Sequence, residues 1–204
     1  MAITCPVKLD RLGLRSEIQS IYARVAEAPS GEFHFHRGPE YAVRRLNYDA
    51  AELSKLPRFV TESFAGVGNP HAIAPLPTGA TIVDIGSGAG TDLLLAAFHV
   101  GRHGRAIGVD MTEAMRQRAR RGATACELEH VEVREGDATA LPIDAESVDV
   151  VMSNGVLNLV PEKRAALAEI RRVLKPAGRV QIADIVLGVD LPEDAREDID
   201  LWAG

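Results

Sequence analysis

The sequence is poor in cysteine and in aromatic residues, and it lacks long apolar runs. Two cysteines, Cys5 and Cys126, are too few for a disulfide framework, so we expect a protein of the reducing cytoplasm. No apolar stretch reaches the ~20 residues that cross a bilayer. Charged residues interrupt the amino-terminal segment, where a signal peptide would have its apolar core. We therefore expect neither a membrane protein nor a secreted, disulfide-rich protein.

Positive charge is also scarce. The chain has 23 Lys and Arg against 29 Asp and Glu, for a formal net charge of −6. A modestly acidic protein lacks the basic surface that binds nucleic acid or anionic membranes. His34 and His36 would share one side of an extended segment, but two ligands are fewer than a structural zinc site uses. We expect no nucleic-acid partner, no membrane partner and no metal.

The 204 residues suffice for about one domain with a sizeable core. Residues 69–79 contain three prolines and a glycine, which mark a break in the pattern. We expect a helical cap over 1–70 and a main unit over 71–204, forming one compact body. Within the cap, three signals predict helix starts. Ser16 with Gln19 and Asp49 with Glu52 form capping boxes, and Pro39 suits a first helical position.

Beyond this break, short apolar runs alternate with amphipathic stretches. The runs predict strands over 81–85, 106–109, 131–133, 148–152 and 180–185. The stretches between them predict helices over 91–100, 112–124 and 161–174. Strand–helix alternation indicates βαβ crossovers and a mostly parallel sheet buried on both faces. The predicted fold class is α/β, a Rossmann-like parallel sheet with flanking helices.

A glycine-rich loop joins the first predicted strand to the helix that follows it. It contains Asp84, Ile85, Gly86, Ser87, Gly88, Ala89 and Gly90. Its G-x-G-x-G spacing differs from the G-x-G-x-x-G of dinucleotide sites. The carboxylate of Asp84 would repel a pyrophosphate but suits an ammonium or sulfonium group. S-adenosylmethionine carries both, and its carboxylate suits the helix amino terminus. The loop favours this cofactor over NAD, although a ligand-free tight turn would use similar glycines.

Two further acidic segments follow the next two predicted strands. Asp110 can accept hydrogen bonds from ribose hydroxyls, and Met111 offers an apolar surface to adenine. The other interpretation of Asp110 is a carboxylate at a helix start, because Thr112 is a favourable N-cap residue. Asp137 could accept from the adenine amino group or serve only as a turn residue. Both segments would face the switch-point crevice of the sheet, together with Gly136 and Ala138.

These motifs resemble the class I S-adenosylmethionine-dependent methyltransferases, and most closely the arsenite methyltransferase group. The similar segments are SFAGVGNP (63–70), DIGSGAGTDLLLAA (84–97), GVDMT (108–112), SNGVLNL (153–159) and ADIV (183–186). The resemblance implies a Rossmann-like fold and S-adenosylmethionine as cofactor. It adds Ser153 and Asn154, at the end of the fourth strand, to the cofactor-binding set named above. We expect Asn154 to orient the acceptor, and His36 of the cap to act as a base.

The sequence departs from the arsenite group where that group has cysteine ligands for arsenic. Val67 and Gly155 occupy two such positions, and a third family cysteine would follow a segment like 201–204. Arsenic is a soft ion that thiolates hold. We therefore expect methyl transfer to a small-molecule acceptor, with inefficient arsenite methylation. The alternatives are a non-catalytic protein that binds S-adenosylmethionine or S-adenosylhomocysteine, and a fragment of a longer methyltransferase.

The carboxyl-terminal part predicts an incomplete sheet. The resemblance implies two more strands after the fifth, whereas residues 192–202 have the pattern of one acidic helix. We expect the fifth strand to be an exposed edge. Because an apolar edge recruits other chains, we expect a homodimer through it.

Overall fold

The computed structural model describes residues 10–186, 188 and 202. Five strands form one sheet: β1 (Thr81–Ile85), β2 (Arg105–Asp110), β3 (Val131–Glu135), β4 (Val148–Asn154) and β5 (Leu174–Ala183). Their order is β3-β2-β1-β4-β5, and every neighbouring pair is parallel. The predicted α/β class and parallel sheet are confirmed. The order reverses beside β1, so the carboxyl ends of β1, β2 and β4 surround a switch-point crevice.

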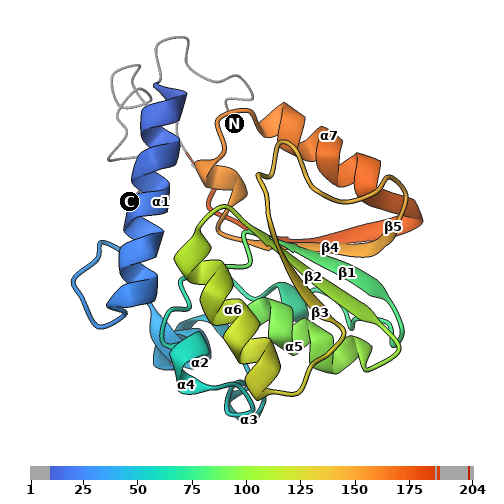
Figure 1. Cartoon of the computed structure of the whole chain (residues 1–204), viewed down its shortest axis with the longest axis horizontal. Helices are drawn as coiled ribbons and strands as arrows, with labels where there is room; N and C mark the ends of the chain where they lie inside the picture. The colour runs from blue at the N-terminus through green and yellow to red at the C-terminus, as the bar shows by residue number, and fades with distance from the viewer. Residues whose placement is uncertain (1–9, 187, 189–201, 203–204) are drawn as a thin grey trace.

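Apolar residues alternate between the two faces of the sheet, and each face has its own helices. On one face Ile82 and Met152 pack with α5 (Thr91–Val100), beside which lies α6 (Glu113–Ala125). On the other face Val83 and Val151 pack with α7 (Lys163–Val173). The three helices predicted in this part of the chain are confirmed with small shifts of their ends. Figure 1 shows α5 and α6 in front of the sheet and α7 above it.

The amino-terminal segment consists of two structurally distinct parts. The helix α1 (Arg11–Glu27) stands beside one end of the sheet (Figure 1). Three short helices follow it, α2 (Gly38–Leu46), α3 (Ala50–Leu53) and α4 (Arg58–Thr61). Leu53 and Val60 of these short helices share one core cluster with Leu94 of α5. Only α1 is therefore a cap, because α2, α3 and α4 belong to the main core.

The starts of these helices test the capping signals. Asp49 caps α3 and Pro39 stands in the first turn of α2, as predicted. The signal at Ser16 is wrong, since α1 begins at Arg11, and the side chain of Asp10 accepts from Gly13 N at 2.9 Å. The apolar stripe of α1 includes Leu14, which is buried, so the helix extends to cover it.

The fifth strand begins six residues before its predicted start. β5 starts at Leu174, directly after α7, and its register against β4 shifts between Val148 and Val150. Ala177 has a φ of 65° within this irregular stretch. Within the described residues, β5 pairs with β4 alone, and Val180 is 44% exposed. The helix predicted over 192–202 lies outside the described residues, apart from Trp202. In the described part of the chain, no helix is both long and apolar enough to span a bilayer.

Candidate active site

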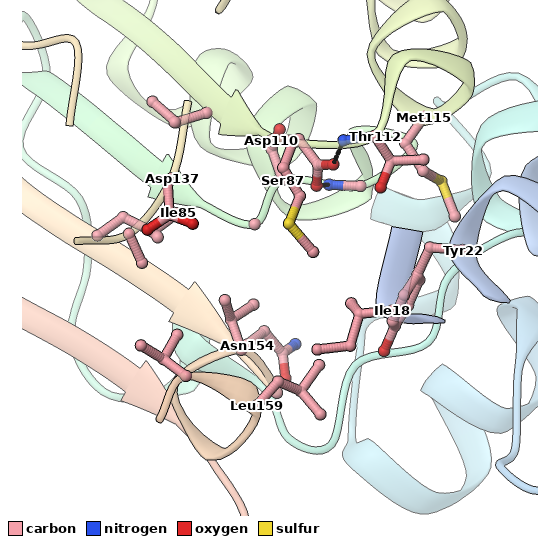
Figure 2. Close-up of a pocket in the computed structure, with 18 of the residues that line it drawn as sticks. Ile18, Tyr22, Ile85, Ser87, Asp110, Thr112, Met115, Asp137, Asn154 and Leu159 are labelled. Atoms are coloured by element: carbon pink, nitrogen blue, oxygen red, sulfur yellow. Dashed lines mark hydrogen bonds between the residues drawn. The ribbon is translucent and has the colours of Figure 1, made fainter. Parts of the chain in front are cut away.

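A cavity of about 310 Å³ lies at the carboxyl ends of β1, β2 and β4. Most of the predicted cofactor residues line it: Asp84, Ile85, Gly86, Ser87, Gly88, Asp110, Met111, Gly136, Asp137, Ala138 and Asn154. The helix α1 forms the opposite wall, from which Ile18 and Tyr22 face these residues (Figure 2). The sheet and the cap thus enclose one space of a size typical of small-molecule sites.

The glycine loop bends sharply around the strand end. Gly86, Gly88 and Gly90 all have positive φ, of 68°, 52° and 97°. The amides of Gly86 and Ser87 both donate to Val109 O, at 2.7 and 3.2 Å, which fixes the loop to β2. A Cβ on Gly90 would lie 3.1 Å from the Cβ of Ala119. Gly90 is therefore needed for contact between α5 and α6, and it does not line the cavity.

The cavity reaches the start of α5 at Thr91 and Asp92. The hydroxyls of Ser87 and Thr91 are buried behind this wall and have no hydrogen-bond partner among the described residues. A helix amino terminus favours a negatively charged group. This part of the cavity therefore fits the carboxylate of S-adenosylmethionine.

Asp84 lies buried near the end of β1, 2% exposed. Burial, together with the charges of Asp92 and Asp110, raises the pKa of Asp84 well above its ordinary value. Buried acids without a cation partner disfavour ionisation. A positively charged ligand in this cavity would reverse that effect, which fits the ammonium and sulfonium groups of S-adenosylmethionine.

Asp110 at the end of β2 accepts one backbone hydrogen bond on each carboxylate oxygen. The donors are Gly88 N and Thr112 N, each at 2.8 Å (Figure 2). Burial raises the pKa of Asp110, while these bonds and Arg116 oppose the rise. Burial and the charge of Asp110 also raise the pKa of Tyr22 to about 12. Asp110 thus fixes the turn before α6 and still has acceptor capacity for a ligand.

Asp137 has both a turn role and a contact with the cap. Its Oδ1 accepts from Thr139 N at 2.7 Å, as a turn residue would. Its Oδ2 lies 3.0 Å from the guanidinium Nη2 of Arg15 in α1. On the same helix, the amide of Gln19 donates to Met111 O at 3.1 Å. These contacts hold α1 over the segments predicted to bind adenine.

The side chain of Asn154 is bonded to protein on both sides. Its Oδ1 accepts from Val67 N at 2.8 Å and from Gly68 N at 3.1 Å. Its Nδ2 donates to Gly68 O at 2.9 Å and to Asp92 Oδ2 at 3.0 Å. The amide therefore fixes the turn 66–68 against the cavity. Both polar atoms of the Asn154 amide are thus bonded to protein, which argues against the expected role in orienting an acceptor.

Two other predicted residues lie away from the cavity. Ser153 is completely buried within β4, and its hydroxyl has no partner among the described residues. The His36 ring packs against Tyr41, with 5.2 Å between ring centroids, and His36 does not line the cavity. His36 lies in the segment between α1 and α2, outside the cavity lining, so the geometry does not support His36 as a base.

Sequence reasoning missed Thr91 and Asp92, which both line the cavity. Each lies in the first turn of α5, one and two residues beyond the glycine loop. The available signal was an acid, Asp92, in the first turn of the helix that follows the glycine loop. This signal is weak, because acids in the first turn of a helix usually lie at the surface, where they complement the helix dipole.

Val67 and Gly155 are neighbours in space, although 88 positions separate them in the sequence. A Cβ on Gly155 would lie 3.1 Å from Val67 Cγ1. Gly155 lines the cavity together with Val156 and Leu159, whereas Val67 and Leu157 do not. Val67 therefore lies beside the cavity wall without lining it. The surface at this end of the cavity has no thiol among its described residues.

The strand order, the glycine loop and the acid at the end of β2 define a class I S-adenosylmethionine-dependent methyltransferase fold. The model of a family described as "Methyltransferase domain" matches residues 77–204. The chain belongs to this methyltransferase domain family.

The relatives of the chain include methyltransferases with different named activities. An arsenite methyltransferase of Halobacterium salinarum is 44% identical over 160 residues, which are 78% of this chain and 41% of that protein. A demethylmenaquinone methyltransferase of Lactococcus lactis is 37% identical over 103 residues, 50% of this chain and 41% of that protein. The crystal structure of an arsenic(III) S-adenosylmethionine methyltransferase from Chlamydomonas reinhardtii is similar, with a TM-score of 0.65 and 34% identity. That likeness covers 74% of this chain and 53% of that one. The chain thus spans less than half the length of these curated relatives.

Proposed function

We propose that this chain binds S-adenosylmethionine in the cavity and transfers its methyl group to a small organic acceptor. The carrying observation is that one cavity joins the buried Asp84, the glycine loop and the start of α5 at the switch point of the sheet. A buried acid with no cation partner among the described residues and a helix amino terminus in one cavity fit a ligand that carries both charges. Bound S-adenosylmethionine supplies an electrophilic methyl group.

Each part of the cavity would hold one part of the cofactor. Asp84 and the loop residues Ile85, Gly86, Ser87, Gly88 and Gly90 would surround or shape the methionyl end. Asp110 would accept from the ribose hydroxyls, with Met111 against the adenine face. Gly136, Asp137 and Ala138 would lie at the adenine edge, and Ser153 and Asn154 would support the floor. The residues 1–70 would act as a helical cap on the cofactor-binding unit 71–204, with its covering part limited to α1.

Calorimetry with S-adenosylmethionine and with NAD tests the cofactor assignment directly. We expect measurable binding of the first and weaker binding of the second, because Asp84 repels a pyrophosphate. Tighter binding of NAD would contradict the proposal. Methyl transfer is then followed with cofactor labelled in the methyl group. Binding without transfer to any acceptor would favour the alternative of a non-catalytic binding protein.

The acceptor end of the cavity supports an organic substrate in place of arsenite. Gly155, Val156 and Leu159 present no sulfur ligand there, and the nearby Val67 offers only methyl groups. Trivalent arsenic is a soft ion and needs thiolates to hold it. An apolar wall instead favours a small organic molecule.

We further propose that the chain works in the cytoplasm, without nucleic-acid or membrane partners, and associates through β5. Val180 of β5 is 44% exposed, and Ile185, two residues after the end of the strand, is 52% exposed. Exposed apolar strand edges pair readily with a second copy. Light scattering of the full chain should show a dimer, and Val180→Lys should weaken it. A monomer at high concentration would contradict this part of the proposal.

A further inference from the structure

A buried acid and a buried histidine lie behind the wall of the cavity. Asp92 of α5 lines the cavity, and its Oδ1 lies 3.2 Å from Nε2 of His71, in the short 3-10 helix η1 (Pro70–Ala72). Their side chains are only 8% and 9% exposed. Neither imidazole nitrogen makes a hydrogen bond among the described residues. An unpaired buried imidazole is rare enough to require an explanation.

Two donors hold Asp92 in place. The Tyr48 hydroxyl donates to Asp92 Oδ1 at 2.6 Å, and Asn154 Nδ2 donates to Oδ2 at 3.0 Å. Burial and the charges of Asp92 and Asp84 raise the pKa of Tyr48 far above its ordinary value, so this hydroxyl keeps its proton. Because Tyr48 keeps its proton and Asn154 only donates to Asp92, this carboxylate is the group of these three that can accept a proton.

A row of titratable groups connects this pair to the surface. The His71 ring lies edge-on to the His99 ring, with 5.5 Å between centroids. His99 Nε2 lies 2.9 Å from Glu52 Oε2, and both side chains are about one-third exposed, at 31% and 32%. His99 and Glu52 therefore continue the row of titratable groups from His71 to the surface.

Other groups packed around His71 do not compete for that proton. The Tyr48 ring lies 6.2 Å from the His71 ring, and this hydroxyl is already committed to Asp92. From β5, Gln181 Nε2 donates to Pro70 O at 2.9 Å, and Arg179 Nε donates to Gln181 Oε1. Asp92 is the one carboxylate within ion-pair distance of His71 among the described residues.

We propose that Asp92 accepts the proton of a phenol-type or enol-type hydroxyl acceptor, and that His71 takes that proton from Asp92. This inference rests on the methyl transfer proposed above. In the reaction the acceptor oxygen forms a bond to the methyl carbon, the sulfur–methyl bond breaks with its electron pair to sulfur, and the hydroxyl proton is released. Asp92 receives this proton, and His71, His99 and Glu52 lead it to solvent.

The acidity of the acceptor decides between hydroxyl and thiol. A thiol with a pKa near 8.5 is already partly ionised at neutral pH, whereas a phenol with a pKa near 10 is not. Trivalent arsenic attacks with a lone pair on an atom that carries no proton. A built proton acceptor is therefore needed most by a hydroxyl substrate, which agrees with the absence of thiols from the described acceptor wall.

The first experiment needs no acceptor. The full chain is labelled with 15N-histidine, and the His71 signals, assigned with His71→Gln, are compared at one pH between the wild type and Asp92→Asn. Because Asp92 Oδ1 lies 3.2 Å from His71 Nε2, we expect the imidazole 15N signals of His71 to shift in Asp92→Asn. The exposed His103 serves as the internal control, and its signals should not shift. Unchanged His71 signals would overturn the inference.

The second experiment compares two acceptors of similar shape and different acidity. Single-turnover transfer from methyl-labelled S-adenosylmethionine is measured at pH 8 with phenol, which is protonated, and 4-nitrophenol, which is ionised. Asp92→Asn should slow transfer to phenol by about 100-fold or more and transfer to 4-nitrophenol by less than about 3-fold. His71→Gln should slow transfer to phenol more than transfer to 4-nitrophenol, whereas His103→Gln should change neither rate.

The outcomes separate the two proposals. Equal slowing with both phenols would overturn the proton-acceptor role of Asp92, and so would the absence of transfer to either phenol while S-adenosylmethionine is bound. If calorimetry shows that the cofactor does not bind to the wild type, the proposed function fails. The NMR comparison then still reports whether His71 senses the side chain of Asp92.

Discussion

The two ends of the cavity are built in different ways. At the cofactor end, Asp84, Gly88 and Asp110 lie within 27 consecutive positions, and backbone N–H groups fix the loop against β2. At the acceptor end, the turn 66–68 meets Asn154 from a distance of more than 80 positions. One end thus depends on local strand–turn–helix geometry, and the other on long-range contacts. Local geometry preserves a cofactor site, whereas substitutions at the other end can alter the acceptor.

The largest effect is expected at the cofactor end, from Asp84→Asn. Removing one partner of a buried charge pair costs about 2–5 kcal/mol, so S-adenosylmethionine affinity should fall by at least about 30-fold. Calorimetry at fixed salt measures this loss. Undiminished affinity would remove Asp84 from the cofactor site.

The same substitution should stabilise the free protein, with a predictable dependence on pH. The folded pKa of Asp84 is raised above its ordinary value of 3.8, so the stability of the wild type falls as pH rises from that value through the folded pKa. Asp84→Asn removes this fall, which amounts to about 1.4 kcal/mol for each unit of pKa elevation. Urea denaturation at pH 4 and pH 8 should therefore show a larger advantage for Asp84→Asn at pH 8. An equal advantage at both pH values would contradict the argument.

Asp110→Ala should have the next largest effect. Each lost charge-assisted hydrogen bond to a ribose hydroxyl costs about 1.5–3 kcal/mol of binding free energy. Part of the loss will come from the loop, since Asp110 also accepts from Gly88 N. Asp110→Asn, which keeps one acceptor oxygen, is the matched control and should lose less affinity. Unchanged binding in both variants would place the ribose elsewhere.

The acceptor end can be changed with Val67→Cys/Gly155→Cys. Glutathione-dependent arsenite methylation should be weak in the wild type and should increase only in the double variant, because two thiolates are needed to hold arsenic. Gly155 has a φ of 69°, and its new Cβ would meet Val67 Cγ1 at 3.1 Å, so Gly155→Cys alone should be destabilised by about 1–2 kcal/mol. Replacing Val67 by cysteine removes the two methyl groups that cause this clash. Efficient arsenite turnover by the wild type would refute the substrate proposal.

The smallest effect is expected where the cap meets the cofactor end. The Arg15–Asp137 ion pair is half-exposed on the arginine side, 48% for its side chain. Exposed pairs contribute about 0–1 kcal/mol, so Arg15→Ala should change the unfolding free energy by less than that. Hydrogen exchange of α1 should nevertheless increase more than in Arg11→Ala, which removes the more exposed ion pair with Glu162. Equal exchange in both variants would show that Arg15 does not hold the cap.

The sequence alone determined the α/β class, the parallel sheet, the three helices that flank it and most of the residues at the proposed cofactor end of the cavity. These features follow from hydrophobic periodicity and from glycine and acid positions within one strand–turn–helix unit, where neighbours in sequence are neighbours in space. Ser16 and the start of β5 were misjudged because tertiary burial of Leu14 and the irregular pairing of β5 with β4 override local signals.

Only the tertiary structure decided the acceptor end. Three contacts there join segments that are distant in the sequence. Val67 meets Gly155, Asn154 holds the turn 66–68, and His71 lies behind Asp92. No periodicity reports such contacts, because they depend on how the sheet order and the short amino-terminal helices bring chain segments together. For the same reason a histidine of the cap was expected to reach the cavity, whereas the histidine that lies 3.2 Å from a cavity acid belongs to η1.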